Sequence, residues 1–155
     1  MPRSFKETLS GYERLRTESH PNCVVCGKSI ENGLGLEFRA VGEGMVEATF
    51  ACQRFLEGYP DVLHGGIVCT LLDGAMTNCV FACGSAAMTG DLHVRFRKPV
   101  AANGWAVVRA WIEASSSPLY RLAASLEQDG EIKATAKARF VEREVARRLA
   151  GGAYQ

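Results

Sequence analysis

The sequence lacks an excess of either charge, and it lacks an uninterrupted apolar run of membrane-spanning length. Its 155 residues include 18 Lys and Arg against 17 Asp and Glu, a formal net charge of +1 at pH 7. We therefore expect no surface that calls for nucleic acid or for an anionic membrane. The most apolar stretch, residues 67–88, is interrupted by Thr70, Asp73, Thr77 and Asn78, so no membrane span is expected there.

The sequence also shows no internal repeat and no apolar core of the signal-peptide type. Its first residues read Met-Pro-Arg-Ser-Phe-Lys-Glu-Thr-Leu, a mixed segment that does not predict secretion. The six cysteines are therefore expected to be reduced thiols of a cytoplasmic protein. Four of them lie in apolar runs, where a free cysteine packs like a small hydrophobic residue: Cys52, Cys69, Cys79 and Cys83.

The length suits one domain with a sizeable core. We predict an N-terminal helix or arm and a Cys-containing loop over residues 1–33, a domain over residues 34–141 and a charged tail over residues 142–155. Within the domain, alternation of apolar and polar residues predicts a hairpin turning at residues 42–44. Its inward residues are Leu34, Leu36, Phe38 and Ala40, then Val46, Ala48, Phe50 and Cys52.

A loop over residues 53–63 then leads to one long helix, predicted over residues 66–82 and buried because it is apolar on most sides. Four alternating segments follow. Their inward residues are Leu92, Val94 and Phe96; Ala106, Val108, Ala110 and Ile112; Tyr120, Leu122, Ala124 and Leu126; and Ile132, Ala134, Ala136, Ala138 and Phe140. Strands segregated from a lone helix predict an α+β fold, a curved antiparallel sheet wrapped around that helix. The open edges of such a sheet favour dimerisation.

The segment Val62-Leu63-His64-Gly65-Gly66 joins a paired-glycine helix start to Asp73, a carboxylate among apolar residues. A helix start offers unpaired N–H groups to a developing oxyanion, and a carboxylate in apolar surroundings is costly without a partner or a function. Gly66 and Asp73 are seven positions apart, roughly 10 Å along one helix. Two groups acting on one carbonyl must both lie about 3 Å from it. The spacing therefore predicts a homodimer, with Gly66 of one chain facing Asp73 of the other.

These segments resemble the hotdog-fold acyl-CoA thioesterases, especially the group that includes the phenylacetate-pathway thioesterases. The matching pieces are Gly58-Tyr-Pro-Asp-Val-Leu-His64-Gly-Gly-Ile, Leu72-Asp73-Gly-Ala-Met76 and Met88-Thr89-Gly-Asp-Leu-His-Val-Arg-Phe-Arg-Lys-Pro99. The resemblance covers roughly residues 34–141. It implies hydrolysis of a thioester to a free acid and coenzyme A in a homodimer or a dimer of dimers. It also implies that no metal or redox cofactor is needed, since coenzyme A enters as part of the substrate.

The resemblance further implies roles for individual residues. The amide of Gly65 or Gly66 would polarise the thioester carbonyl. Asp73 of the facing subunit would act as general base for water or as a nucleophile, and the hydroxyl of Thr89 would help to place water. His64 is expected to be a structural or positioning residue. Residues expected to contact substrate are Leu63, Thr70, Gly74 and Thr77.

Two features depart from the family pattern. Many relatives carry Glu where this chain has Gly74, and the Asn or Gln that some members place before the His is absent at Gly58, although Gln53 is near in sequence. A glycine inside a helix indicates either close approach of the substrate arm or partner helix, or tolerated drift. These departures leave the assignment of Asp73 as the base unchanged and weaken the assignment of substrate-positioning residues. Two alternatives stay open: a non-catalytic acyl-CoA-binding protein, for which Gly74 leaves room, and a hotdog hydratase or dehydratase.

Several residue groups have competing interpretations. Asp73 could instead bond to backbone or face water at a helix kink. The basic residues on the predicted strands are interpreted mostly as a solvated face, and one or two of them are expected to contact the phosphates of coenzyme A. These residues are Arg95, Arg97, Lys98, Lys133, Lys137 and Arg139. Trp105, Trp111 and Tyr120 are interpreted as packing residues, and the acyl tunnel is expected to involve Phe55, Met76, Val80 and Phe81.

The motif Cys23-Val-Val-Cys26-Gly has the spacing of half a zinc site or of a redox pair. No second Cys or His pair accompanies it, and His20 is the only extra candidate ligand nearby. We interpret the motif as a structural loop.

Overall fold

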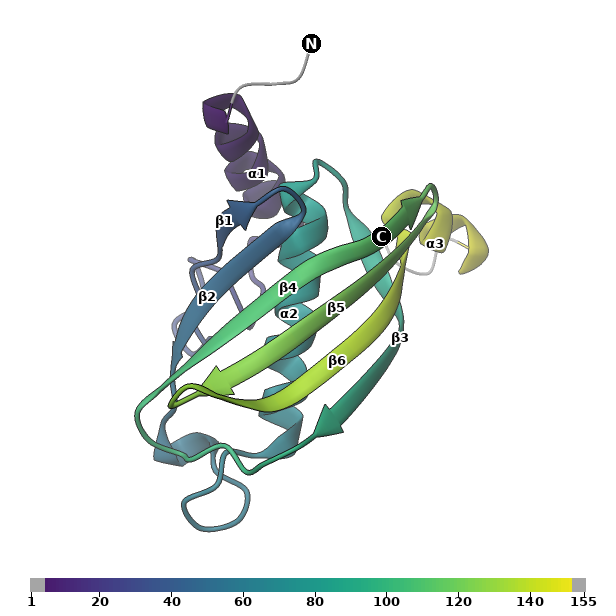
Figure 1. Ribbon diagram of the computed structural model, residues 1–155. Helices are drawn as coiled ribbons and strands as arrows, with labels where there is room; N and C mark the ends of the chain where they lie inside the picture. The colour runs from purple at the N-terminus through teal and green to yellow at the C-terminus, as the bar shows by residue number, and fades with distance from the viewer. Residues whose placement is uncertain (1–4, 152–155) are drawn as a thin grey trace.

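The computed structural model describes residues 5–151 and shows one six-stranded antiparallel sheet curved around a long helix (Figure 1). The sheet has the order β1-β2-β4-β5-β6-β3, so β1 and β3 form its edges. The strands are β1 (Arg39–Gly42), β2 (Met45–Ala51), β3 (Ala87–Phe96), β4 (Trp105–Ser116), β5 (Leu119–Gln128) and β6 (Glu131–Glu142). The helices are α1 (Phe5–Ser19), α2 (Gly65–Ala82), α3 (Arg143–Leu149) and the 3-10 turn η1 (Arg54–Leu56). The predicted α+β architecture is confirmed.

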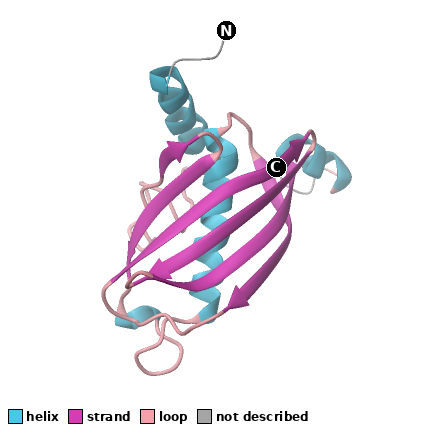
Figure 2. Cartoon of the chain, viewed as in Figure 1, coloured by secondary structure: helices cyan, strands magenta, loops and turns pink. Residues whose placement is uncertain are grey.

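Helix α2 lies along the concave side of the sheet (Figure 2) and supplies much of the core. It begins one residue before the predicted start. It ends at Ala82. Two residues later Gly84 has a φ of +81°, a conformation that glycine adopts without steric cost. By length and composition alone α2 could cross a membrane, but most of it is buried within the protein. That burial under the sheet accounts for its apolar composition.

The inward faces of the central strands match the predicted alternation. Val46, Ala48 and Phe50 of β2 are buried, as are Val108 of β4 and Leu122 of β5. The predicted hairpin is present, but its first strand is shorter than expected. Leu36 is buried without joining β1, because the N–H groups of Leu34 and Leu36 bond to the carbonyls of Val24 and Val25 at 2.7 and 2.9 Å. The Cys-containing loop therefore replaces a sheet partner along this segment.

Three predictions about inward or packing residues are wrong. Phe96 is 56% exposed because β3 is an edge strand, and its ring lies over the start of α2 beside Gly65. Ile132 is 40% exposed because the register shifts between Leu126 and Glu127, which pairs Ile132 with Glu127 on the outer face. Trp105 is 65% exposed and does not pack in the core.

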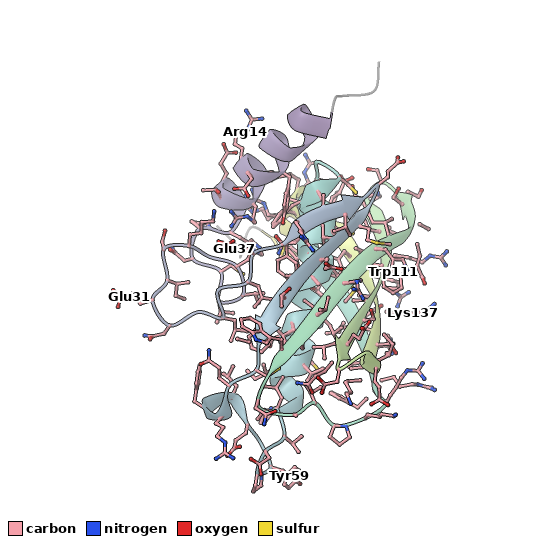
Figure 3. All side chains as sticks on the ribbon, turned by 60° about the vertical axis from the view of Figure 1, so that its left-hand side comes forward. Arg14, Glu31, Glu37, Tyr59, Trp111 and Lys137 are labelled. Carbon is pink, nitrogen blue, oxygen red and sulfur yellow. The ribbon has the colours of Figure 1, made fainter. Side chains whose placement is uncertain are left out.

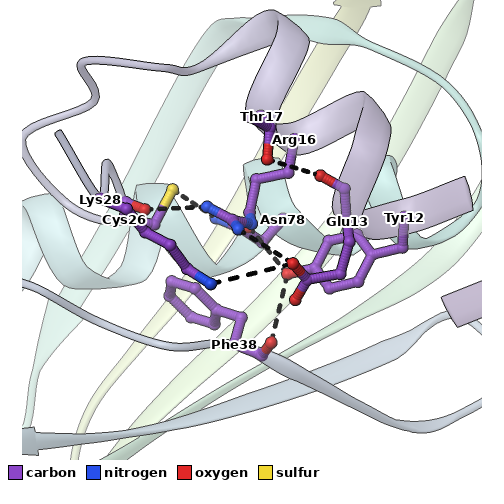
Figure 4. A network of polar contacts seen from close by, with 8 residues as sticks. All are labelled: Tyr12, Glu13, Arg16, Thr17, Cys26, Lys28, Phe38 and Asn78. Atoms are coloured by element: carbon purple, nitrogen blue, oxygen red, sulfur yellow. Dashed lines mark hydrogen bonds and ion pairs between the residues drawn. The ribbon is translucent and has the colours of Figure 1, made fainter. Parts of the chain in front are cut away.

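Both flanking segments contain a helix: of the predicted helix or arm the structure shows the helix, and the predicted charged tail begins with a helix that was not predicted. Helix α1 docks on α2, where the buried Tyr12 hydroxyl donates a 2.9 Å hydrogen bond to Asn78 Oδ1 (Figure 4). Burial raises the pKa of Tyr12, which keeps this donor protonated. Helix α3 occupies part of the predicted tail, and the N–H of Arg143 bonds to the carbonyl of Ala86 at 2.9 Å. Residues 1–4 and 152–155 of the predicted arm and tail lie outside the described residues.

Candidate active site

The start of α2 leaves one backbone amide unpaired. His64 is the N-cap, and its Nδ1 accepts a 2.8 Å hydrogen bond from the N–H of Gly66. The N–H groups of Ile67 and Val68 bond to the carbonyl of His64. Within residues 5–151 the N–H of Gly65 has no partner. The sequence alone left both Gly65 and Gly66 as candidate oxyanion donors. In the structure the His64 side chain accepts the N–H of Gly66, so the N–H of Gly65 is the one left available.

A cavity of about 730 Å³ opens at this helix start. Its lining includes Leu63, His64 and Gly65, together with Phe96 at the end of β3 and the residues 97–99 that follow it. Tyr59, also at this cavity, projects from the loop before α2 (Figure 3). The cavity thus combines a free amide with aromatic and basic side chains.

The basic residues divide into paired and unpaired groups. Lys98 and Lys133 both bind Glu131, at 2.6 and 2.9 Å. Lys137 binds Glu113, and Arg139 binds Asp91. Neither Arg95 nor Arg97 makes an ion pair within the described part of the chain. Of these two residues, only Arg97 lines the helix-start cavity. Arg97 is therefore the unpaired cation at the cavity.

Asp73 lies half-buried on α2, eight positions after Gly65. Its Oδ1 accepts a 2.7 Å hydrogen bond from the hydroxyl of Thr89 on the edge strand β3. Burial raises the pKa of the Asp73 carboxyl, and the Thr89 hydrogen bond opposes that rise by stabilising the charged form. Thr89 is the only hydrogen-bond partner of this carboxylate among residues 5–151. The structure thus brings together Asp73 and Thr89, two residues to which the resemblance assigned separate roles at one site.

A second cavity, of about 350 Å³, surrounds Asp73. Thr70, Gly74 and Thr77 line it from α2, and Leu92 lines it from β3. The hydroxyls of Thr70 and Thr77 donate to the backbone carbonyls of Gly66 and Asp73, at 2.8 and 3.0 Å. Of the four residues expected to contact substrate, these three lie with Asp73, whereas Leu63 lies at the helix start.

The close neighbour of Gly74 belongs to the same chain. A Cβ atom at Gly74 would lie 2.6 Å from Cγ1 of Val25, which is the third residue of the Cys23-Val-Val-Cys26 motif. The sequence left two interpretations of Gly74, close approach of a substrate arm or partner helix and tolerated drift, and the structure places the Cys-containing loop there instead. A glycine at position 74 is what lets this loop seat against α2.

The two cavities share no lining residue. Gly65 and Asp73 of one chain therefore do not face the same cavity. This is expected, because eight residues of helix separate them by about 12 Å along its axis. Three residues expected to line an acyl tunnel lie elsewhere. Met76, Val80 and Phe81 are packed under the sheet and line neither cavity, while Phe55 is exposed.

Sequence analysis missed the residues that face Asp73 from the N-terminal segment. His20 and Cys23 line the Asp73 cavity, together with Val24 and Val25. Hydrogen bonding from the neighbouring Cys26 thiol lowers the pKa of Cys23, and the same hydrogen bond, together with burial, raises the pKa of Cys26. The motif was visible in the sequence, but no local periodicity connects it to a residue fifty positions later.

Comparisons with known proteins show what the sequence and the fold are similar to. Residues 61–117 match the family model described as the thioesterase superfamily. Bovine (Bos taurus) acyl-coenzyme A thioesterase THEM4 is 36% identical over 76 residues, which span 47% of this chain and 31% of the bovine protein. The chain thus matches less than a third of the length of that relative.

Two solved structures share the fold over most of the chain. A phenylacetic acid degradation-related protein from Ralstonia eutropha JMP134 is 25% identical, with a TM-score of 0.70 over 84% of this chain and 98% of that protein. The E. coli PaaI protein from the phenylacetic acid degradation operon is 17% identical, with a TM-score of 0.73 over 86% and 94%. The chain therefore has the hotdog fold, and its residues 61–117 match the model of the thioesterase superfamily.

Proposed function

We propose that this protein hydrolyses acyl-CoA thioesters to a free acid and coenzyme A. The observation that carries the proposal is the pairing of two features on α2: the unpartnered N–H of Gly65 at the helix start and the Asp73 carboxylate held by Thr89. An amide donor and a carboxylate base are the groups that thioester hydrolysis needs. The matched segment of a mammalian acyl-coenzyme A thioesterase supports the same substrate class.

The proposed chemistry uses the chain's own groups. The Gly65 amide hydrogen-bonds to the thioester oxygen and stabilises its negative charge as water attacks the carbon. Asp73 accepts a proton from that water, the new C–O bond forms, and the C–S bond breaks. The proton then passes to the departing coenzyme A thiolate. Direct attack by Asp73, through a mixed anhydride, uses the same two groups in a different order.

The proposal requires two chains. Gly65 and Asp73 lie about 12 Å apart along one helix, whereas both must come within about 3 Å of one carbonyl. An antiparallel pair of α2 helices would bring Gly65 of one protomer to Asp73 of its partner and create two equivalent sites. We therefore propose a homodimer, alone or within a dimer of dimers. The sheet edge at β3, which carries Thr89, supports placement of an interface on this side.

Arg97 is the proposed contact for the phosphates of coenzyme A. It lines the helix-start cavity and makes no ion pair within residues 5–151, and a guanidinium can bind phosphate through two hydrogen bonds. We further propose that the chemical step needs no metal or redox cofactor and that the protein acts in the cytoplasm, where its thiols remain reduced.

The test is hydrolysis of a panel of short-chain, long-chain and aryl acyl-CoA substrates. We expect loss of the thioester absorbance with at least one class. Asp73→Asn should fold and assemble normally but lose at least about 100-fold in turnover, the scale of a missing general base.

Asp129→Asn is the matched control, because it makes the same substitution in an exposed turn where Asn tolerates the positive φ of 55°. Near wild-type turnover by Asp73→Asn would refute the assignment. Tight binding of acyl-CoA without release of thiol would point to a binding protein, and hydration of an enoyl-CoA to a hydratase.

A further inference from the structure

Three metal-ligating side chains meet in the loop after α1, outside the proposed catalytic groups. They are His20, Cys23 and Cys26, and one candidate ligand atom of each lies within 4.8 Å of the other two. In a tetrahedral zinc site, bonds of about 2.3 Å to sulfur and 2.0 Å to nitrogen place neighbouring ligand atoms about 3.5–3.8 Å apart. The cluster is therefore compact enough to close on one ion with small side-chain movements.

The backbone is folded to bring the two sulfur atoms together. The N–H of Gly27 bonds to the carbonyl of Cys23 at 2.8 Å, and the N–H of Val25 donates to Cys23 Sγ at 3.4 Å. A Cβ atom at Gly27 would lie 2.6 Å from the carbonyl oxygen and 2.7 Å from the nitrogen of Cys23. Only glycine fits at position 27, so the turn that gathers the two sulfurs is built into the sequence.

Polar neighbours around the cluster suit bound thiolates. The side-chain amide of Asn78 on α2 donates to Cys26 Sγ at 3.5 Å. The buried guanidinium of Arg16 donates to the Cys26 carbonyl at 3.0 Å and brings a positive charge close to that residue (Figure 4). Such hydrogen bonds and charges orient metal ligands and stabilise anionic sulfur.

His20 is half-buried, and one of its two ring nitrogens is shielded from solvent. Its Nδ1 atom is buried and has no hydrogen-bond partner within residues 5–151. Its ring packs edge-on against Phe81, with ring centroids 5.0 Å apart. A buried polar atom without a partner calls for a group that the chain does not supply, and a cation at the adjacent sulfurs is such a group.

We propose that His20, Cys23 and Cys26 bind one Zn²⁺ ion, and that the ion fixes the loop over residues 20–27 against α2. Two thiolates and an imidazole form the borderline-soft donor set that zinc prefers, and two thiolates balance its charge. His20 and Cys23 also line the Asp73 cavity, so water can supply a fourth ligand from that side. The ion would then hold one wall of the cavity, with Val25 seated on Gly74.

This proposal does not depend on the proposed hydrolase activity. A Cys-x-x-Cys pair can instead serve as a dithiol that closes to a disulfide. The third donor at His20 and its unpartnered nitrogen favour the metal, because a disulfide would leave both unexplained.

The test is a titration of the full-length reduced protein with Co²⁺, a spectroscopic substitute for Zn²⁺. We expect one equivalent per chain, a thiolate-to-cobalt charge-transfer band and displacement by Zn²⁺. Cys23→Ser, Cys26→Ser and His20→Ala should each weaken or abolish the band. Cys83→Ser is the matched control, because Cys83 is exposed and does not belong to the three-residue cluster, and it should keep the band.

Stability gives a second measurement. Zn²⁺ at about 100 times its dissociation constant should raise the melting temperature of the wild type by about 5–10 °C and should not raise that of His20→Ala. Failure of the reduced wild type to bind stoichiometric Co²⁺ would overturn the proposal, as would a band that persists in Cys23→Ser and His20→Ala. If Cys26→Ser does not fold, the wild type and His20→Ala decide. Asp73→Asn should keep the band while losing turnover, so failure of either proposal is visible separately.

Discussion

The chemical character of Asp73 comes from two influences that act in opposite directions. Burial beside apolar residues raises its pKa, and the hydroxyl of Thr89 stabilises the carboxylate form through a 2.7 Å hydrogen bond. A general base works best when its pKa lies near the working pH but still leaves it ionised. In the proposed mechanism Thr89 therefore has a part in setting the pH range of activity, beyond any role in placing water.

Thr89→Val should move the acidic limb of kcat/KM to higher pH. The base is active as a carboxylate, so activity is lost as the pH falls through its pKa. Removing the hydrogen bond removes the stabilisation of the charged form, which raises that pKa further. The measurement is kcat/KM against pH for both proteins. Thr89→Ser keeps the hydroxyl and should show the same acidic limb as the wild type. An acidic limb of Thr89→Val that is unchanged or shifted to lower pH would contradict the assignment.

Single residues differed in how far the sequence could assign them. Asp73 stands out as a candidate in the sequence because it is the only carboxylate on an apolar helix. The choice of Gly65 over Gly66 was not, because it depends on the ring orientation of His64, which alone decides which amide is occupied. The position of His20 was also beyond prediction, since its contacts come from tertiary packing of the N-terminal segment on α2.

At the scale of elements, alternation predicted the strands well wherever the sheet is regular and covered. It failed for Ile132 because a register shift moves a residue to the opposite face, and no local pattern marks the shift. It failed for Phe96 because β3 is an edge strand, where no neighbouring strand covers one side of the ring. The start of α2 was predicted within one residue, since paired glycines and an apolar run follow a capping residue.

The geometry of that helix start allows its amide to be removed without removing the helix. Gly65 is the first helical residue, where proline is well tolerated, and His64 before it has the extended backbone (φ −58°, ψ 133°) that a following proline requires. Gly65→Pro should therefore fold and yet lose about 100–1,000-fold in kcat, as expected for a lost oxyanion donor. Turnover is measured alongside the melting temperature to confirm folding.

Gly65→Ala is the matched control for that variant. It keeps the N–H group, and its Cβ would make ordinary contact with the Phe96 ring at 3.5 Å. It should retain most of the activity. Equal losses in the alanine and proline variants would show that space at position 65, rather than its amide, is what matters. Full activity of a folded proline variant would remove Gly65 from the mechanism.

At the scale of the whole molecule, one chain has the two halves of the proposed site at separate cavities. The sequence spacing along α2 was enough to predict this separation, because helix rise is fixed. What the spacing leaves undetermined is the chain that supplies the second half. Genetic complementation between two inactive variants addresses that question directly.

Co-expression of Asp73→Asn with Gly65→Pro should restore activity that neither variant has alone. With random pairing, half of the dimers are mixed, and each mixed dimer holds one site carrying both substitutions and one site carrying neither. About a quarter of wild-type turnover is therefore expected, measured on the purified mixture with its composition checked by native mass spectrometry.

Co-expression of Asp73→Asn with the double variant Asp73→Asn, Gly65→Pro is the control, because no pairing of those chains contains an intact site. Mixed dimers without recovered activity would mean that Gly65 and Asp73 do not act together across an interface, since a shared site is the only arrangement in which two defective chains can repair each other.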